Sequence, residues 1–298
     1  MQATRTLLAL GLAAATLASP ALAQSGGTLD KIRQSGSITV GHRESSVPFS
    51  YLDAEQKPVG YMMDLCTKVV DAVKAELKLA SLQVRYQPVT AQNRIPLMQN
   101  GTIDIECGST TNSVARQQQV AFSVTPFITS VRMAVRKDSG VTDIGDLDGK
   151  PLVTTTGTTS DALIKQNEKG KSIDVRNIYG KDHADSFLMV QSGRAAAFVM
   201  DDILLAGLIA SSKSPGDFAI VGPSLRDEPY GVMLRKDDAA FKALVDRTLT
   251  AMIGSGEVDA LYAKWFLNPI PPRNVNLNFP MSPALKAALA SPNDKGVE

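Results

Sequence analysis

Short apolar runs alternate with amphipathic stretches along the first half of the chain. Between Asp64 and Leu79, apolar residues recur at every fourth position, which places them on one face of a helix. The predicted order is a helix at Leu29–Gln34, a strand at Ser37–Gly41, a helix at Asp64–Leu79, a strand at Leu82–Pro88, a helix at Gln92–Asn100 and a strand at Ile103–Glu106. Strands that alternate with helices predict a mainly parallel sheet covered by helices.

The same alternation begins again after a strand at Val131–Arg136. The predicted strands are Leu152–Thr155, Asp174–Ile178, Ala196–Met200, Phe218–Val221 and Tyr230–Leu234. The predicted helices are Asp161–Asn167 (capped by Ser160), His183–Ser192, Asp202–Ser211 (capped by Asp202), Ala239–Ile253 and Glu257–Phe266. Two α/β units of this kind would bring the carboxyl ends of their strands together around one cleft, where such folds bind ligands.

The first residues have the composition of an export signal. Arg5 supplies a positive charge, Leu7–Ala18 is an apolar run, and Ala21-Leu22-Ala23 has the small residues of a cleavage site. The run is too short to span a bilayer, and we expect no transmembrane segment elsewhere. We therefore expect a signal peptide at 1–23 and an exported, periplasmic chain starting near Gln24, without a lipid anchor because no cysteine follows Ala23.

Charge and cysteine content exclude several classes of function. The chain carries 31 basic and 30 acidic residues, and this balance argues against nucleic acid or an anionic membrane as a partner. The two cysteines, Cys66 and Cys107, could pair in an oxidising compartment. Two separately buried small apolar side chains are the alternative that we favour. No histidine or cysteine has the spacing of metal ligands, so we expect neither a metal nor a cofactor.

The stretch Ile103–Phe127 combines a short strand, a turn of hydroxylated residues and a helix that opens near Ser113. Arg116 falls in the first helical turn, where the helix dipole disfavours a cation. Free helix N–H groups, the hydroxyls of the turn and a guanidinium together favour a carboxylate or phosphate. The alternative is an exposed arginine on an ordinary helix.

Several blocks in order along the whole mature chain resemble the periplasmic solute-binding proteins of the polar amino-acid class. They are TLDKI, VGHRESSVPFSY, QNRIPLMQNGTIDIECGSTTN, KDHADSF, SGRAAAFVMDDILLAG, YGVMLRKDD and KWFLNPIPP. Within that class the blocks resemble the glutamate/aspartate-binding components of ABC transporters.

The resemblance implies an α/β, two-lobed periplasmic-binding-protein fold of type II, with two mixed, mainly parallel sheets joined by two hinge strands. Lobe 1 would comprise 28–127 plus 222–298, and lobe 2 would comprise 128–221. The crossings would fall near Pro126–Ser130 and Ala219–Gly222, and the lobes would close over the ligand as a hinged clamp.

The resemblance also assigns residues to the head of a bound amino acid. Arg116 would hold the α-carboxylate, which Ser109 and Thr111 face from the same lobe. The turn Gly157-Thr158-Thr159 of the other lobe would donate to that carboxylate, above all through Thr159. Asp201 would meet the α-ammonium group.

Arg43, Arg94 and His183 match the positions that bind the distal carboxylate in binders of acidic amino acids. A buried carboxylate needs pairing and hydrogen bonds, and arginine supplies both. Each of the three also has a non-functional alternative: Arg43 as a solvated side chain, Arg94 as an ordinary residue at a helix start, and His183 as a helix-cap or surface residue. Where close relatives carry serine, this chain has Ala91, which removes a hydroxyl that could bond the ligand.

Binding of glutamate or aspartate, followed by delivery to an ABC transporter permease, is the function that these residues favour, for a chain that we expect to be a monomer. The candidate residues include no catalytic set of a nucleophile with its base, and no set of metal ligands, that would indicate catalysis. A dehydratase-like enzyme on a small carboxylate, with His183 or Asp201 as the acid or base, is one alternative. A ligand-sensing module of a receptor is another.

Overall fold

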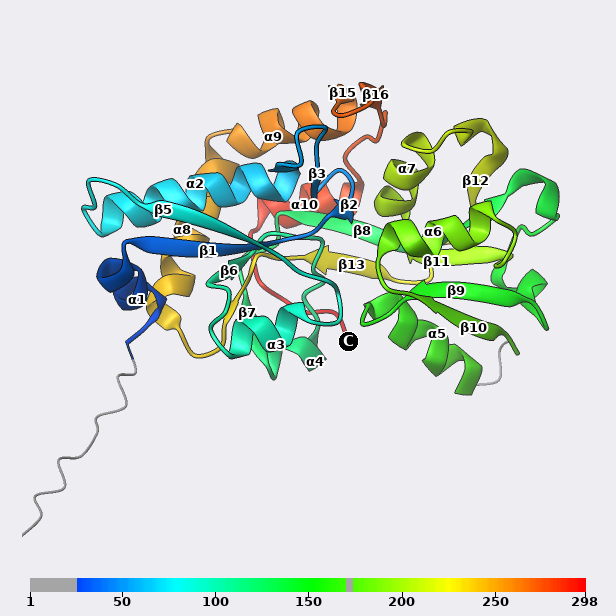
Figure 1. The fold of residues 1–298 in the computed structure, drawn as a ribbon, viewed down its shortest axis with the longest axis horizontal. Coiled ribbons are helices and arrows are strands. Elements are labelled where there is room, and N and C mark those ends of the chain that lie inside the picture. Colours follow the sequence, from blue (N-terminus) through cyan, green and yellow to red (C-terminus); the bar gives the residue numbers. More distant parts are fainter. Residues whose placement is uncertain (1–25, 170–173) are drawn as a thin grey trace, which may run out of the picture.

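The computed structural model describes residues 26–169 and 174–298. The predicted signal peptide, 1–23, lies outside the described residues. The elements form two mixed sheets that lie side by side, each covered by helices, with long strands passing between them (Figure 1).

The first sheet has the strand order β5-β1-β6-β14-β7. Its strands are β1 (Ser37–His42), β5 (Gln83–Pro88), β6 (Ile105–Glu106), β7 (Val120–Phe122) and β14 (Met233–Arg235). β1 pairs in parallel with β5 and β6, whereas β14 is antiparallel to β6 and β7. The parallel pairing that the alternating pattern predicted is therefore confined to β5, β1 and β6.

Helices cover both faces of the first sheet, with α2 on one face and α3 on the other (Figure 1). They are α1 (Thr28–Ser35), α2 (Tyr61–Glu76), α3 (Arg94–Gln99), α4 (Val114–Gln117), α8 (Ala239–Gly254), α9 (Glu257–Tyr262, followed by a π-helical turn at Ala263–Leu267) and α10 (Pro283–Ala290). α2 begins three residues before the predicted Asp64, because Tyr61 and Met62 extend its buried face.

The second sheet has the order β10-β9-β11-β8-β12. Its strands are β8 (Phe127–Arg136), β9 (Pro151–Thr155), β10 (Arg176–Gly180), β11 (Ala197–Asp201) and β12 (Phe218–Val221). Its helices are α5 (Thr159–Lys169), α6 (His183–Gln191) and α7 (Asp202–Ala210). Only β9 pairs in parallel within the described part of this sheet, with β10 and β11, whereas β8 is antiparallel to its neighbours.

The predicted helix caps of this unit need correction. α5 begins at Thr159, and the hydroxyl of Thr158 accepts the N–H of Asp161 at 3.1 Å, so Thr158 takes the capping role that we expected of Ser160. Asp202 is the first residue of α7; its carboxylate accepts the N–H of Ile203 at 2.7 Å and the hydroxyl of Thr129 at 2.6 Å. Asp202 therefore ties α7 to β8 as well as serving the helix start.

The strand predicted at Tyr230–Leu234 is wrong, because two strands occupy this stretch. β13 (Asp227–Tyr230) pairs with the first residues of β8, and β14 pairs in the first sheet. Between them, Gly231 donates its N–H to the carbonyl of Thr110 at 3.1 Å, which turns the chain from one sheet to the other. β8 and β13 thus run together between the sheets (Figure 1).

The cysteines correct the alternative that we favoured from the sequence. Cys66 of α2 and Cys107 at the end of β6 form a disulfide, with their Cα atoms 6.2 Å apart. Both side chains are buried, as expected, but they are bonded to each other rather than buried separately. The bond holds the helix to the strand that leads into the hydroxylated turn.

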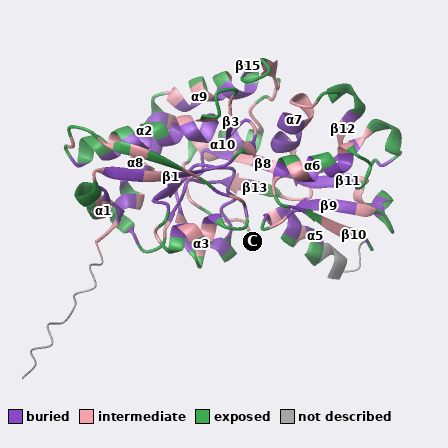
Figure 2. Cartoon of the chain, viewed as in Figure 1, coloured by how far each residue is buried: buried purple, intermediate pink, exposed green. Residues whose placement is uncertain are grey.

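The core extends from one sheet to the other, and buried residues follow the strands and the inward faces of the helices (Figure 2). An aromatic cluster fills the start of the passage between the sheets: the ring of Phe127 in β8 lies 4.7 Å from Phe49 and 5.0 Å from Phe266. Tyr230 of β13 packs on Phe49 at 5.1 Å. Two small sheets complete the fold: β2 (Ser45–Ser46), β3 (Ser50–Leu52) and β4 (Pro58–Val59), and β15 (Pro269–Ile270) with β16 (Val275–Asn276).

Candidate ligand-binding site

The predicted binding residues lie at strand ends and helix starts. On the side of the first sheet are Arg43 after β1, Arg94 at the start of α3, Ser109 and Thr111 after β6, and Arg116 in α4; on the side of the second sheet are Thr158 and Thr159 at the start of α5, His183 at the start of α6, and Asp201 at the end of β11. All are buried except Thr159, which is half-buried.

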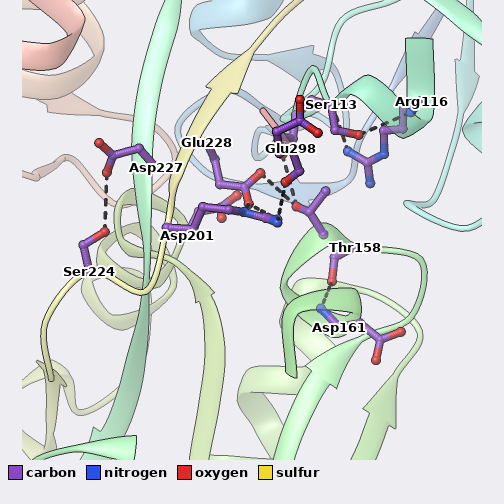
Figure 3. Close-up of polar contacts among 12 residues, drawn as sticks. Ser113, Arg116, Thr158, Asp161, Asp201, Ser224, Asp227, Glu228 and Glu298 are labelled. Atoms are coloured by element: carbon purple, nitrogen blue, oxygen red, sulfur yellow. Dashed lines mark hydrogen bonds and ion pairs between the residues drawn. The ribbon is translucent and has the colours of Figure 1, made fainter. Parts of the chain in front are cut away.

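Arg116 connects the two sides. Ser113 caps α4 by accepting the N–H of Arg116 at 3.3 Å, as Figure 3 shows. The guanidinium donates from Nη1 to the carbonyl of Thr111 at 2.9 Å and from Nη2 to the carbonyl of Gly157 at 3.1 Å. Its alternative as an exposed arginine is wrong, since only 8% of the residue is accessible.

Burial sets the electrostatics of this arginine. Desolvation, reinforced by the nearby charge of Arg94, lowers the pKa of Arg116 to about 9, against the opposing pull of Glu228, Glu106 and Asp201. A cation held at this cost is stabilised by an anion in contact with it. The geometry therefore suits a bound carboxylate.

The turn before α5 approaches the first side closely. Gly157 has a φ of +81°, and a Cβ there would lie 2.8 Å from the Cα of Gln92. Thr159 and Thr111 place their hydroxyl oxygens 3.3 Å apart across the same gap. The absence of a side chain at Gly157 thus lets the two sides meet.

Two predicted side chains are engaged elsewhere. The hydroxyl of Thr158 donates to the carbonyl of Thr155 at 2.7 Å and caps α5 (Figure 3). The hydroxyl of Ser109 donates to that of Ser46 at 3.2 Å. The backbone at these positions is also engaged: the N–H of Thr158 donates to the carbonyl of Thr155 at 3.2 Å, and the carbonyl of Ser109 accepts from Arg94 at 3.3 Å.

Arg43, Arg94 and His183 form a second buried group. The Nη2 atom of Arg43 lies 3.5 Å from the Nε2 atom of His183, whose Nδ1 atom lies 3.1 Å from the hydroxyl of Thr155. Burial and the two arginines lower the pKa of His183 well below its ordinary value, so the imidazole is neutral. Facing a donor, Nε2 accepts and Nδ1 donates to Thr155.

Within the described residues, no ion pair joins a carboxylate to either arginine of this group, although the charge of Glu106 acts on both. Burial and the proximity of Arg94 lower the pKa of Arg43 to about 10, and burial lowers that of Arg94. Arg94 donates to the carbonyl of Ser109 at 3.3 Å and to the hydroxyl of Thr110. Among the described residues, Arg43 Nη1 and Arg94 Nε have no hydrogen-bond partner. Buried donors of this kind indicate an anion site.

Asp201 contacts a residue that the sequence pattern did not indicate. Tyr230 donates its hydroxyl to Oδ2 of Asp201, while Oδ1 is buried without a partner in the described part of the chain. Burial and Glu228 raise the pKa of Asp201 to about 8. The unoccupied oxygen is available to a donor such as an ammonium group.

Two further buried carboxylates were missed. Glu106, at the end of β6, accepts the hydroxyl of Thr110 at 2.6 Å, and Glu228 in β13 accepts that of Thr159 at 3.0 Å. A charged residue ending the apolar run Ile103–Glu106 was a signal for the first. Nothing in the local sequence distinguishes Glu228 from its acidic neighbour Asp227.

The arrangement can hold a small molecule that carries two separated anionic groups and one cationic group. No cluster of three or more potential metal ligands occurs in residues 26–169 and 174–298. Nor does that part of the chain contain a helix long and apolar enough to cross a membrane.

Comparisons with known proteins identify the family of the chain. A sequence profile of the bacterial extracellular solute-binding proteins, family 3, matches residues 38–268. The chain is 52% identical to an L-glutamate/L-aspartate-binding protein of Pseudomonas aeruginosa, over 100% of this chain and 99% of that one. It is 51% identical to a glutamate/aspartate import solute-binding protein of Escherichia coli, over 97% and 95% of the two chains.

A solved structure supports the same assignment at the level of the fold. A mutant of ArgBP from T. maritima superposes with a TM-score of 0.72 at 26% identity, over 80% of this chain and 98% of that one. The profile and the two relatives span nearly the whole fold, including every predicted site residue. The chain therefore belongs to the bacterial extracellular solute-binding proteins of family 3, and its fold is the type II periplasmic-binding-protein fold.

Proposed function

We propose that the protein captures an acidic L-amino acid, glutamate or aspartate, between its two sheets and delivers it to the membrane permease of an ABC importer. The observation that carries the proposal is the pair of buried arginines, Arg43 and Arg94, whose guanidinium groups retain donors without partners beside a neutral His183. A side-chain carboxylate supplies the missing acceptors and charge. The names of the two relatives at 51–52% identity support the same ligand class.

In this proposal the ligand's head lies at Arg116. Its α-carboxylate accepts from the guanidinium and from the backbone N–H groups of Thr111 and Thr159, with Ser109 beside it, while Thr158 supports the turn through its bonds to Thr155 and Asp161. The α-ammonium group donates to the free oxygen of Asp201. Arg43, Arg94 and His183 bind the distal carboxylate.

We propose that lobe 1 comprises 28–127 plus 222–298 and that lobe 2 comprises 128–221. The pairing of Asp227–Tyr230 with the start of β8 supports a return passage a few residues after the predicted Ala219–Gly222. The protein acts as a periplasmic monomer after removal of residues 1–23, and it performs no chemistry on its ligand.

A calorimetric panel on the chain from Gln24 tests this function. Glutamate or aspartate should bind with a micromolar or lower Kd, about −8 kcal/mol or better, because several charge-assisted bonds act together. Glutamine and arginine should bind much more weakly. Tightest binding of glutamine or arginine would contradict the proposal, and turnover of a cyclic carboxylate would contradict a purely binding role.

A further inference from the structure

Glu228 lies in the passage between the sheets, and its carboxylate is completely buried. Oε2 accepts the hydroxyl of Thr159 at 3.0 Å, and Oε1 accepts Nε of Arg226 at 2.9 Å. Figure 3 shows this carboxylate in β13, beside Asp201 and above the start of α5. Both oxygens thus have donors, one of which belongs to the ligand-binding turn.

The contact fixes the direction of a chain of hydroxyl groups. A carboxylate only accepts, so the hydroxyl hydrogen of Thr159 is directed to Glu228. The Thr159 oxygen, 3.3 Å from the hydroxyl of Thr111, then accepts from Thr111. Thr159 consequently offers a ligand carboxylate its backbone N–H at the start of α5, where helix N–H groups lack partners within the helix, rather than its hydroxyl.

Arg226 extends the contact to the other side of the site. Its Nη1 atom donates to the carbonyl of Glu298 at 3.2 Å. The adjacent Val297 exchanges hydrogen bonds with the loop that starts α4: Val114 donates to the carbonyl of Val297, and Val297 donates to the carbonyl of Asn112, both at 3.0 Å. The Arg226–Glu228 ion pair and the hydrogen bonds on either side of it therefore link the Thr159 turn to the segment that flanks Arg116.

We propose that Glu228 is a positioning residue for the head of the ligand, which holds the Gly157–Thr159 turn in its binding orientation when the two sides are closed. This inference rests on the proposed function. Separation of Thr159 from Glu228 leaves a buried carboxylate oxygen without its donor, which disfavours opening. Loss of the contact should therefore accelerate dissociation of the ligand more than it slows association.

The neighbouring residue provides a matched control. Asp227 has its side chain on the opposite face of β13, where it is exposed and accepts the hydroxyls of Ser130 at 2.7 Å and Ser224 at 3.4 Å (Figure 3). Asp227→Asn removes the same charge from the same strand without touching Thr159.

The test measures dissociation of radiolabelled glutamate and aspartate from the chain starting at Gln24. Glu228→Gln should raise the dissociation rate of both ligands by about tenfold, the loss of one hydrogen bond to a charged group. The ratio between the two ligands should not change, because Glu228 acts on the head that they share. Asp227→Asn should leave both rates unchanged.

A double-mutant cycle separates positioning from a structural role. Thr159→Val should raise the dissociation rate as Glu228→Gln does, and the double variant should dissociate no faster than Thr159→Val alone, because both changes remove one contact. The inference would be overturned if the rate increases of the two single variants multiplied in the double variant. It would also be overturned if either single variant dissociated at the wild-type rate. Should Glu228→Gln fail to fold, Thr159→Val alone still tests it without altering a buried charge. A wild-type protein that binds no amino acid would instead refute the proposed function.

Discussion

At the scale of single residues, two buried arginines of the site keep donors without partners among the described residues, and the charge of Glu106 is the main favourable charge that acts on them. Arg43 and Arg94 are each 2% exposed, and the described residues give neither a carboxylate within ion-pair distance. Burial of a cation without a partner costs stability. A bound anion would supply the missing acceptors, which is why we propose that these two guanidinium groups bind the distal carboxylate of the ligand.

Replacement of Arg94 by Gln should mainly remove the preference for an acidic side chain. The ratio of glutamate to glutamine affinity should fall by about 10–100-fold, which corresponds to ~1.5–3 kcal/mol for a lost charge-assisted bond. Residual binding should persist because Arg116 is untouched. Calorimetry with both amino acids measures this, with Arg85→Gln on the exposed edge strand as the control; an equal loss for both ligands would contradict the division between head and distal groups.

Asp201 should couple binding to pH. Its pKa is raised to about 8, mainly by burial and then by Glu228, so at neutral pH the ligand-free carboxyl is mostly protonated. An ammonium ligand needs the ionised form, so affinity should rise with pH up to about 8 and binding should release a proton. Calorimetry in buffers of different ionisation enthalpy counts that proton, and Asp201→Asn should abolish its release.

The same shift has a definite sign for stability. The folded ligand-free state holds a proton that the unfolded chain, with a carboxyl pKa of about 3.9, has already lost at neutral pH. The contribution of Asp201 to the free energy of unfolding is therefore complete below pH 4 and is lost as pH rises through about 8. The free energies of unfolding of wild type and Asp201→Asn, measured in urea across this pH window, should converge toward acid pH.

At the scale of elements, the hydroxylated turn between β6 and α4 is held from both ends. The disulfide fixes Cys107 to α2 at its start, and Ser113 caps α4 at its end. Between these points the turn supplies Thr110 to Arg94 and the carbonyl of Thr111 to Arg116. The groups that we propose to bind the ligand thus come from a loop that is anchored at both ends.

Reduction of the disulfide should lower stability measurably. A bond that closes a loop over a sequence separation of 41 residues restricts the unfolded chain, and its loss should cost about 2–4 kcal/mol. Urea unfolding with and without reductant measures the change. The double variant Cys66→Ala with Cys107→Ala should be equally destabilised and insensitive to reductant; a wild-type midpoint that reductant does not move would contradict the role of the bond.

At the scale of the whole molecule, the two sides of the site touch at a few points. Arg116 reaches Gly157, Thr111 reaches Thr159, and Arg43 reaches His183. The close approach at Gly157 depends on a residue without a side chain. If the two sides close over the ligand as we propose, closure and completion of the site would be the same event.

Gly157→Ala should impair closure and weaken every ligand alike. The added Cβ would lie 2.8 Å from the backbone of Gln92, so glutamate and aspartate affinities should fall together, by at least about tenfold, without a change in their ratio. Small-angle scattering should show less compaction on ligand addition. Gly149→Ala is the control, because Gly149 also has a positive φ, +69°, but nothing within 4 Å of its Cβ position. Equal losses of affinity in the two variants would mean that backbone strain at a positive φ, and not the contact with Gln92, causes the effect.

The pattern of apolar residues was sufficient for most elements because burial on one face imposes a fixed period on a helix or strand. It located α1, β1, α6 and β12 to within a residue or two. It failed where contacts between distant segments determine the local structure. The stretch Tyr230–Leu234 is divided between two sheets by the turn at Gly231. Ser160 is buried, and Thr158 forms the helix cap instead.

For the site, the sequence by itself indicated Arg116 and the hydroxylated turn after β6 as an anion-binding combination, because residue type and position at a strand end are local; Arg43, Arg94 and the donor role of the Gly157-Thr158-Thr159 turn came from the resemblance to the family. Tertiary structure alone decided the pairing of Cys66 with Cys107, the neutral state of His183 and the contact of Tyr230 with Asp201. It also selected Glu228 over Asp227, adjacent carboxylates of one strand that face opposite ways. These features depend on distances between segments far apart in the chain, and local periodicity carries no information about such distances.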